Sequence, residues 1–232
     1  MLTFLEGAPL HQAPRSAGQM RALGEALGVV ARALSDFRPE VPQQDLLWDL
    51  CKAGSLRELT PFVGAERRSA AERALDAFEL MAQGPMRALP RQVIHNDFNP
   101  HNVLVGADDP ERIAGVIDFG DMVEAPRIND LAVALSYQVA LGAGFDLAVT
   151  ALAAYCRVFP LTSEEIACLP TLLRMRLAMT ILITEWRSKL HPENRAYILR
   201  NHALANAGLV KLANFSDAAL AAHFQASLET LA

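Results

Sequence analysis

Hydrophobic and polar positions repeat with a helical period over much of the chain. From Ser16 to Phe37 apolar residues recur every three to four positions, which is typical of an amphipathic helix, and Ser16 is suited to cap its N-terminus. Residues 65–83 have the same period, after a stretch over residues 38–64 that contains three prolines. This part of the chain therefore predicts two helices joined by a loop that carries one short helix.

Short β-branched runs replace the helical period between residues 92 and 118. VLV and RIAGVID are separated by GADDPE, a polar segment typical of a hairpin turn, so we expect a small sheet here. Thr162 and Glu165 have the spacing of a capping box. Helical patterning fills most of the chain beyond Ile128, over residues 129–141, 145–158, 170–190, 193–212 and 217–231. The whole pattern predicts a mostly helical α+β fold with a small β-hairpin.

The composition is that of an ordinary soluble globular protein. The chain has 232 residues, of which 52% are hydrophobic and 20% charged, and its net charge of -5 offers no basic surface for nucleic acid or anionic lipid. Its three cysteines, Cys51, Cys156 and Cys168, form no C-x-x-C pair, which favours a reducing cytoplasm over a disulfide framework. The most apolar stretch, residues 177–183, is much shorter than the roughly 20 residues of a membrane span. We expect a cytoplasmic protein without nucleic acid or membrane partners.

Polar residues concentrate in VIHNDFNPHNVLV, residues 93–105, between two short apolar runs. A loop held between strands is where a rigid scaffold presents reactive groups. His95, Asp97 and Asn102 match the pattern H-x-D-x-x-x-x-N, and Asp118 follows in the D-F-G element IDFG. Phosphoryl transfer from a nucleotide needs a carboxylate at the acceptor hydroxyl and oxygen ligands for Mg²⁺. The segment is therefore a candidate active site of that kind.

With HNDFNPHNVLV, GVIDFGDMV and NDLAVAL the chain resembles the aminoglycoside phosphotransferase and choline kinase group of protein-kinase-like enzymes, and within it the hydroxylysine kinase-like members. The resemblance covers nearly the whole chain, as the larger C-terminal lobe of that fold. It implies that Asp97 is the catalytic carboxylate and that His95 supports the loop. It also implies that Asn102 and Asp118 bind Mg²⁺ and with it the nucleotide, ATP or GTP. The γ-phosphate would pass to a hydroxyl of a small amine-bearing acceptor.

Three further acidic residues are candidates for supporting or binding roles. Asp121 could help to hold the metal, contact a cationic substrate or cap the turn. Asp130 could cap the helix that follows it, whereas the resemblance implies that it supports the catalytic loop from beneath; we favour a structural role. Glu185 lies where related kinases bind their acceptor and could pair with a substrate ammonium. We expect Trp48 and Trp186 to be packing residues and Arg174 and Arg176 to form a solvated or paired helix face.

Two alternatives remain open at this point. The rival chemistry is a metal-dependent hydrolase, whose transition metal would be surrounded by His95, Asp97, His101, Asp118 and Asp121. His101 by itself is expected to be a loop residue that hydrogen-bonds the backbone. The other alternative is a non-catalytic kinase-like remnant that binds metal weakly or serves as a partner subunit for a separate nucleotide-binding half.

The glycine-rich loop and strand lysine of a complete kinase do not occur in the sequence. Lys52, which alone among the lysines precedes the catalytic loop, lies in the loop-like segment DLCKAGS. LTFLEGAPL resembles the last strand and hinge of an N-terminal lobe, so we expect residues 1–14 to be the remainder of that lobe and residues 15–232 the catalytic and substrate-binding C-terminal lobe. The rest would belong to a longer chain or a partner chain. This chain alone should then have little activity, because positioning supplies most of the catalysis in phosphoryl transfer.

Overall fold

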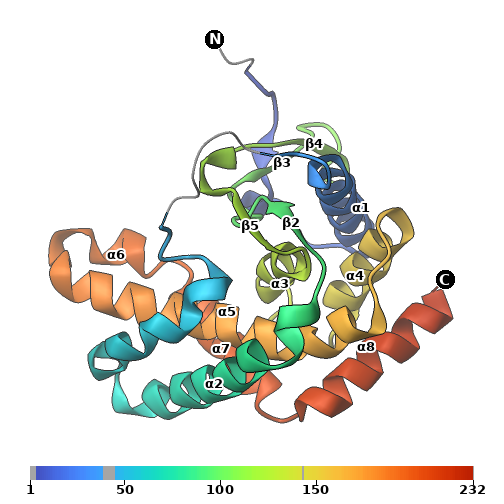
Figure 1. The fold of residues 1–232 in the computed structure, drawn as a ribbon. Coiled ribbons are helices and arrows are strands. Elements are labelled where there is room, and N and C mark those ends of the chain that lie inside the picture. The colour runs from blue at the N-terminus through green and yellow to red at the C-terminus, as the bar shows by residue number, and fades with distance from the viewer. Residues whose placement is uncertain (1–3, 39–44, 143, 232) are drawn as a thin grey trace.

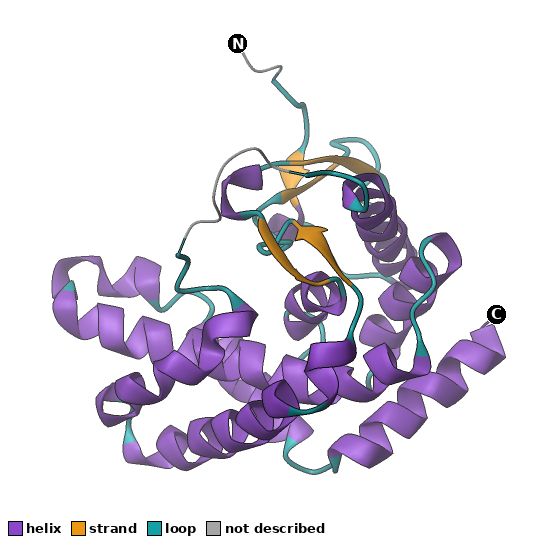
Figure 2. Ribbon diagram, viewed as in Figure 1, coloured by secondary structure: helices purple, strands orange, loops and turns teal. Residues whose placement is uncertain are grey.

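The computed structural model describes residues 4–38, 45–142 and 144–231. Its strands gather at one end of a helical body (Figure 1), and Figure 2 shows how small the strand content is. The mostly helical α+β fold is thus confirmed. The beginning of the expected 1–14 segment, residues 1–3, and residues 39–44 of the expected loop lie outside the described residues.

The first helix, α1 (Ala17–Leu34), begins where the sequence pattern places it. The Ser16 hydroxyl oxygen accepts a hydrogen bond from the Gln19 backbone N–H at 3.0 Å, which satisfies one of the unpaired donors at the helix start. Its apolar face packs along α4 (Asp146–Val158). Gly24 lies in this contact, because a side-chain carbon there would collide with the α4 backbone.

The loop expected over residues 38–64 contains more regular structure than the pattern predicts. A 3₁₀ helix, η2 (Leu50–Phe62), occupies its second half. The next helix, α2 (Ala65–Gln83), has the expected bounds and ends at the short η3 (Pro85–Ala88). Both η2 and α2 pack on the long helix α5 (Ser163–Leu190), and this packing compensates for the weak helical period of η2.

The strands form two small antiparallel sheets. In the first, β1 (Ala8–Pro9) pairs with β3 (Val103–Val105), which pairs with β4 (Ile113–Val116) in the expected hairpin. In the second, β2 (Arg91–Ile94) pairs with β5 (Val123–Pro126). The sequence pattern does not predict β5, because its residues VEAP include two poor strand formers and its pairing comes from a partner distant in sequence. The polar loop, residues 95–102, thus begins at the end of β2 in one sheet and ends at the start of β3 in the other.

The C-terminal half is helical, as expected, with shifted boundaries. A short 3₁₀ turn, η4 (Phe119–Asp121), precedes β5, and the helix α3 (Ile128–Ser136) follows it. The helix expected over residues 193–212 is divided into η5 (Pro192–Asn194), α6 (Arg195–Ile198) and α7 (His202–Leu212), and α8 (Asp217–Leu231) ends the described chain. The division leaves α6 as a separate turn beside α5 (Figure 1).

The longest helix is α5 (Ser163–Leu190), which starts at the predicted capping box and not at Pro170. Its length and its mean hydropathy of 1.7 over an 18-residue window would suffice for a membrane span, but 89% of that window is buried inside the fold. The helices α2, α3, α7 and α8 all pack on it. Because the helix is surrounded by other helices, it is apolar on nearly all sides and not only on one face.

Candidate active site

The polar loop between β2 and β3 is held from below by Asp130, in the first turn of α3. The buried Asp130 carboxylate accepts hydrogen bonds from the backbone N–H groups of His95, at 2.8 Å, and Asn96, at 2.6 Å. The expected cap role is wrong, because α3 begins at Ile128 and Asp130 points toward the loop. Burial raises the pKa of Asp130 to about 6, although the two N–H donors and the nearby imidazole oppose this effect.

His95 connects the loop to the segment that carries the D-F-G element. Its side chain is buried; Nδ1 accepts a hydrogen bond from the Asp97 backbone N–H at 3.3 Å, and Nε2 lies 3.0 Å from the carbonyl oxygen of Ile117. The ring also lies against Phe98 and Phe119. Both ring nitrogens therefore have partners within the protein, an arrangement that suits a supporting residue.

Asp97 faces an opening at the surface, with 22% of its side chain exposed. Its Oδ2 accepts hydrogen bonds from the side-chain amides of Asn99 and Asn102, each at 2.8 Å, and the Asn102 amide also donates to the Asp97 carbonyl oxygen at 3.0 Å. These contacts fix the direction of the carboxylate. Because the Asn102 nitrogen is occupied in this way, its Oδ1 is the atom left to bind a ligand. The sequence analysis did not identify Asn99 as part of this network.

Asp118 lies beside this network, because the Ile117 backbone N–H donates to the carbonyl oxygen of Asn102 at 2.9 Å. The backbone of Asp118 is left-handed, with φ 66° and ψ 61°, a conformation uncommon outside glycine. Its side chain is exposed and forms no hydrogen bond or ion pair with the residues that the structure describes. An amide oxygen and a free carboxylate fit Mg²⁺, which often has one or two protein ligands and takes others from substrate phosphates.

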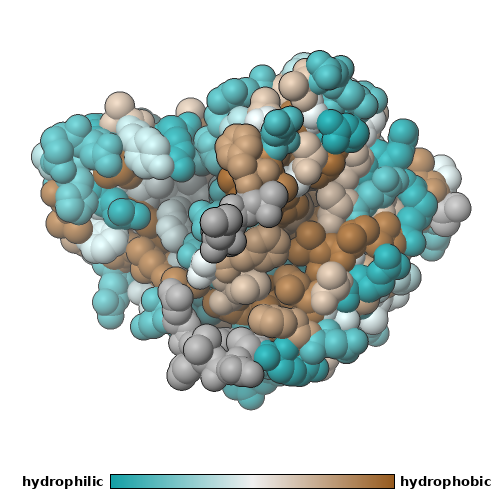
Figure 3. All heavy atoms as spheres, turned by 90° about the horizontal axis from the view of Figure 1, so that it is seen from above, coloured by the Kyte–Doolittle hydropathy of each residue, from teal (hydrophilic) through white to brown (hydrophobic). Residues whose placement is uncertain are grey.

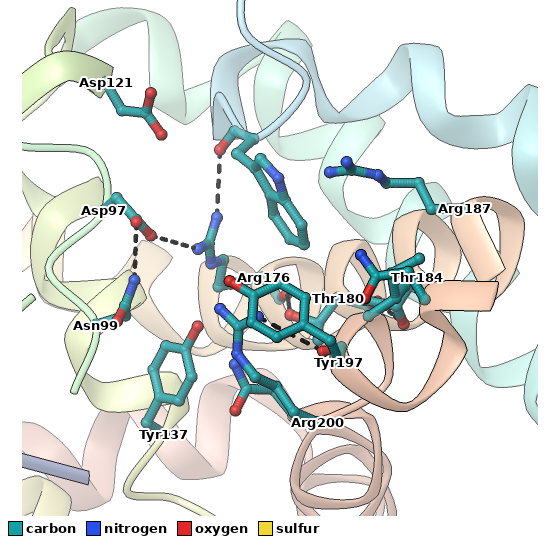
Figure 4. A pocket seen from close by; sticks show the side chains of 14 residues that line it. Asp97, Asn99, Asp121, Tyr137, Arg176, Thr180, Thr184, Arg187, Tyr197 and Arg200 are labelled. Carbon is teal, nitrogen blue, oxygen red and sulfur yellow. Dashed lines mark hydrogen bonds and ion pairs between the residues drawn. The ribbon is translucent and has the colours of Figure 1, made fainter. Parts of the chain in front are cut away.

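Asp121 is half-buried at the edge of a cavity next to Asp97 (Figure 4). Burial raises the pKa of Asp121, and the carboxylates of Asp97 and Asp118 raise it further. The side chain has no hydrogen-bond partner within the described part of the chain, so the alternative that it caps the turn is not supported. The three carboxylates therefore form one electrostatically coupled group.

The cavity has a volume of about 340 Å³, which is the size of a small metabolite. Asp97 and Asn99 contribute the loop side of its wall, and Trp48 and Tyr137 line it too. The remaining lining comes from α5 and from residues 194–201, which include Tyr197. The sequence pattern gives no sign of this cavity, because its walls come from segments far apart along the chain.

Arg176 is the main site residue that the sequence analysis missed, having been expected on a solvated or paired helix face. It is 2% exposed, and its guanidinium lies 3.4 Å from Asp97 Oδ1 and 4.9 Å from the centre of the Trp48 ring. One signal was available, since Arg176 interrupts the buried apolar run of α5. Trp48 lines the cavity as well as packing on the core, whereas Arg174 pairs with Asp217 as a paired helix face should.

The expectation that Glu185 faces the substrate is wrong. Its carboxylate accepts hydrogen bonds from the backbone N–H of Gly64 at 2.9 Å and from Arg67 at 2.7 Å, and it lies 2.9 Å from His202 Nε2. These contacts lower the pKa of Glu185 despite the opposing effect of burial. Glu185 thus joins α5 to α2 and α7 and is absent from the cavity wall.

The geometry does not support a metal-dependent hydrolase. The His101 ring stacks on His11, with 4.1 Å between the ring centres, and burial together with His11 lowers the pKa of His101. His95 is held by its own hydrogen bonds. Within residues 4–38, 45–142 and 144–231, no group of three or more His, Cys, Asp or Glu side chains is arranged to hold a metal ion.

Comparisons with known proteins agree with these observations. Hydroxylysine kinase from Mus musculus is 24% identical in an alignment of length 211 that covers 86% of this chain and 56% of that protein. Among solved structures, a microcompartment-associated aminopropanol kinase aligns with a TM-score of 0.67 at 17% identity, over 99% of this chain and 69% of its own. An amicoumacin kinase in complex with AMP-PNP, Ca²⁺ and Ami aligns with a TM-score of 0.55 at 16% identity, over 82% and 59%.

These likenesses establish the kinase-like fold, and this chain spans little more than half the length of the curated relative. The family model described as "Phosphotransferase enzyme family" matches residues 1–165, which include every oxygen ligand and carboxylate of the loop described above. That match covers well over half of the chain. The chain therefore belongs to the phosphotransferase enzyme family.

Proposed function

We propose that this chain is the catalytic and acceptor-binding part of a small-molecule kinase, which moves the γ-phosphate of ATP or GTP to a hydroxyl group of an amine-bearing metabolite. The main observation that supports this proposal is the position of the Asp97 carboxylate, which is fixed by two amides and faces a cavity of metabolite size. The family match and the kinases among its relatives support this function. Hydroxylysine is one candidate acceptor; aminoglycosides, choline, ethanolamine and homoserine are others.

In the proposed reaction Asp97 accepts a hydrogen bond from the acceptor hydroxyl and takes its proton as the bond between the acceptor oxygen and the γ-phosphorus forms. The bond from the γ-phosphorus to the bridging oxygen of the nucleotide breaks, and the nucleoside diphosphate leaves. Asn99 and Asn102 keep the carboxylate in one orientation, so no reorganisation is needed during the reaction. Asn102 Oδ1 and the Asp118 carboxylate would hold Mg²⁺, which neutralises charge on the nucleotide phosphates when bound. Asp121, at the edge of the cavity, is placed to attract the ammonium group of the acceptor.

We further propose that a nucleotide-binding lobe, in the same longer chain or in a partner chain, covers the face that carries Asp118. The two neighbours of Asp118 in the sequence, Ile117 and Phe119, are 38% and 39% exposed. Figure 3 shows that apolar side chains form a broad band on the face seen from above. Residues 1–14 would connect to that lobe. The cytoplasm, where nucleoside triphosphates are abundant, is the proposed location.

Nucleotide turnover by a longer form that includes this lobe tests the function, with a panel of hydroxylated amines and amino acids as acceptors. An Asp97→Asn variant should lose a factor of about 10² to 10⁴ in kcat, the usual contribution of a general base. Asn102→Ala should raise the Mg²⁺ concentration needed for half-maximal rate, and His101→Ala, the matched loop control, should change neither quantity much. Full transfer by Asp97→Asn would refute the mechanism, and no transfer to any acceptor would favour the non-catalytic alternative.

A further inference from the structure

The charged side chains of the cavity do not balance one another. Arg176, Arg187 and Arg200 line it together with two carboxylates, Asp97 and Asp121. Arg176 pairs with Asp97, which leaves two arginines and one carboxylate for an occupant. The cavity wall therefore offers fewer carboxylates than arginines, which leaves guanidinium groups available to an anionic group of an occupant.

Arg176 shows that the donors of this cavity are incompletely used. Its side chain is 98% buried by the fold, yet its Nε has no hydrogen-bond partner within the described residues. Its contacts with Asp97 and with the Trp48 carbonyl oxygen are long, at 3.4 and 3.3 Å. A buried donor without a good partner costs free energy, so an acceptor atom brought in by a ligand would stabilise the site.

Arg187 and Arg200 are the two arginines available to a ligand. Arg187, from the end of α5, donates to no side chain or carbonyl group that the structure describes, and its guanidinium points toward the cavity from the side opposite Asp97 in Figure 4. Arg200, from the turn before α7, lies 3.9 Å from the centre of the Tyr197 ring and has a single long hydrogen bond, at 3.5 Å, to the Tyr197 carbonyl oxygen. The planar guanidinium fork matches the geometry of a carboxylate.

We propose that Arg187 and Arg200 form a carboxylate-binding subsite and that the acceptor is a zwitterionic hydroxy amino acid. Its hydroxyl group faces Asp97, its ammonium group lies toward Asp121, and its carboxylate lies at the arginine side of the cavity. The proposal rests on the proposed kinase function, because it assigns the parts of the same acceptor. It disfavours amino alcohols and quaternary amines, which leave both arginines without an anion.

The test uses pairs of acceptors that differ only by the carboxylate: homoserine with 3-aminopropan-1-ol, and hydroxylysine with 1,5-diaminopentan-2-ol. Binding of each compound to this chain, without nucleotide, is measured by calorimetry and by ligand-observed NMR. The carboxylated member of at least one pair should bind tighter by about tenfold or more, the usual worth of a charge-assisted hydrogen bond. Equal affinity within both pairs, or no measurable binding of any of the four, would overturn the proposal.

Two variants and one control test whether Arg187 and Arg200 cause the preference for carboxylated compounds. Arg187→Gln and Arg200→Gln should each reduce the preference for the carboxylate about tenfold. Arg195→Gln removes the same charge from α6 at a residue outside the cavity wall, so it should keep the preference. A preference that survives both cavity variants would refute the assignment, provided that thermal unfolding shows both to be folded.

The outcomes for the subsite and for the proposed function can be separated. Transfer of phosphate to the decarboxylated compounds as fast as to the amino acids would refute the subsite and leave the kinase function standing. Carboxylate-selective binding by this chain, without phosphoryl transfer by the longer form, would support the subsite and count against the kinase function.

Discussion

Glu165, fully buried at the start of α5, forms a two-pronged ion pair with Arg127, the residue that precedes α3. Arg127 Nε donates to Glu165 Oε1 at 2.8 Å, and its terminal nitrogen donates to Oε2, also at 2.8 Å. Oε2 accepts a further hydrogen bond from the Thr162 backbone N–H in the capping box. Since Asp130 follows Arg127 by less than one helical turn, this pair holds the helix that in turn holds the active-site loop.

A Glu165→Gln variant keeps the shape of the side chain and the ability to form the capping box. It replaces one carboxylate oxygen by an amide group that faces donors of Arg127, whose side chain is only 13% exposed. Breaking a buried pair from one side leaves the other charge uncompensated, which costs about 3 to 5 kcal/mol. Most of this loss should appear in the free energy of unfolding, because the fold covers most of the Arg127 side chain, which becomes hydrated only when the chain unfolds.

Urea unfolding followed by circular dichroism measures this free energy. Glu164→Gln, at the exposed neighbouring position, is the matched control and should stay within about 0.5 kcal/mol of the parent protein. Replacing both partners by methionine should recover much of the loss, because an apolar pair leaves no buried charge. A loss below about 1 kcal/mol for Glu165→Gln would refute the reasoning, since no buried charge could then have been left unpaired.

Three other predictions follow from single contacts. The pKa of Asp130 is raised to about 6 from an ordinary 3.8, so its stabilising contribution is fully present below about pH 4 and is lost as the pH rises through about 6. An Asp130→Asn variant should therefore lack this fall in the free energy of unfolding. A variant with the same pH profile as the parent protein would contradict this prediction. Gly24→Ala should cost about 1 to 3 kcal/mol in urea unfolding, because the added methyl meets the Ala151 carbonyl oxygen, whereas Gly54→Ala, with its nearest neighbour at 3.8 Å, should cost little. Arg176→Met should lower kcat of the longer form about tenfold or more, because it removes the cation beside Oδ1 of Asp97, the proposed base, while the unfolding free energy stays nearly unchanged; an unchanged kcat would exclude that positioning role.

The fold was predictable where local pattern and packing agree. The bounds of α1 and α2 follow from a helical period and, for α1, a capping serine. The β3–β4 hairpin follows from its polar turn. By contrast, β5 exists through pairing with the distant β2, and Pro170 lies within α5 because the capping box begins the helix earlier. Contacts between distant segments leave no local period, so the sequence pattern could not predict β5, whereas the start of α5 was marked locally by the capping box.

The site residues, like the secondary structure, were predictable only where the local sequence determines their position. The proximity of Asp97, Asn102 and Asp118 was predictable because one loop and one short element carry them at fixed spacing, and local hydrogen bonds join Asn102 to Asp97 and to the backbone of Ile117 beside Asp118. Arg176 was missed and Glu185 was misplaced, although both lie on α5. Which face of a long core helix points to a cavity depends on what packs around it, and almost the whole of α5 is surrounded.

The family match covers the site residues of the loop but not those that α5 contributes to the cavity wall. The family match ends at residue 165, after the carboxylates and amides of the loop but before the α5 arginines Arg176 and Arg187. Phosphoryl transfer needs the same few oxygen ligands whatever the acceptor, whereas the acceptor is recognised by the wall opposite them. The wall residues from Thr180 to Asn201 come from one continuous stretch, α5 to the start of α7, and Arg176 is the wall residue of α5 that pairs with Asp97, so the rest of this stretch can change its side chains without disturbing Asp97. Acceptor specificity should therefore follow α5–α7 in exchanges between relatives, while the dependence on Asp97 and Asn102 stays constant.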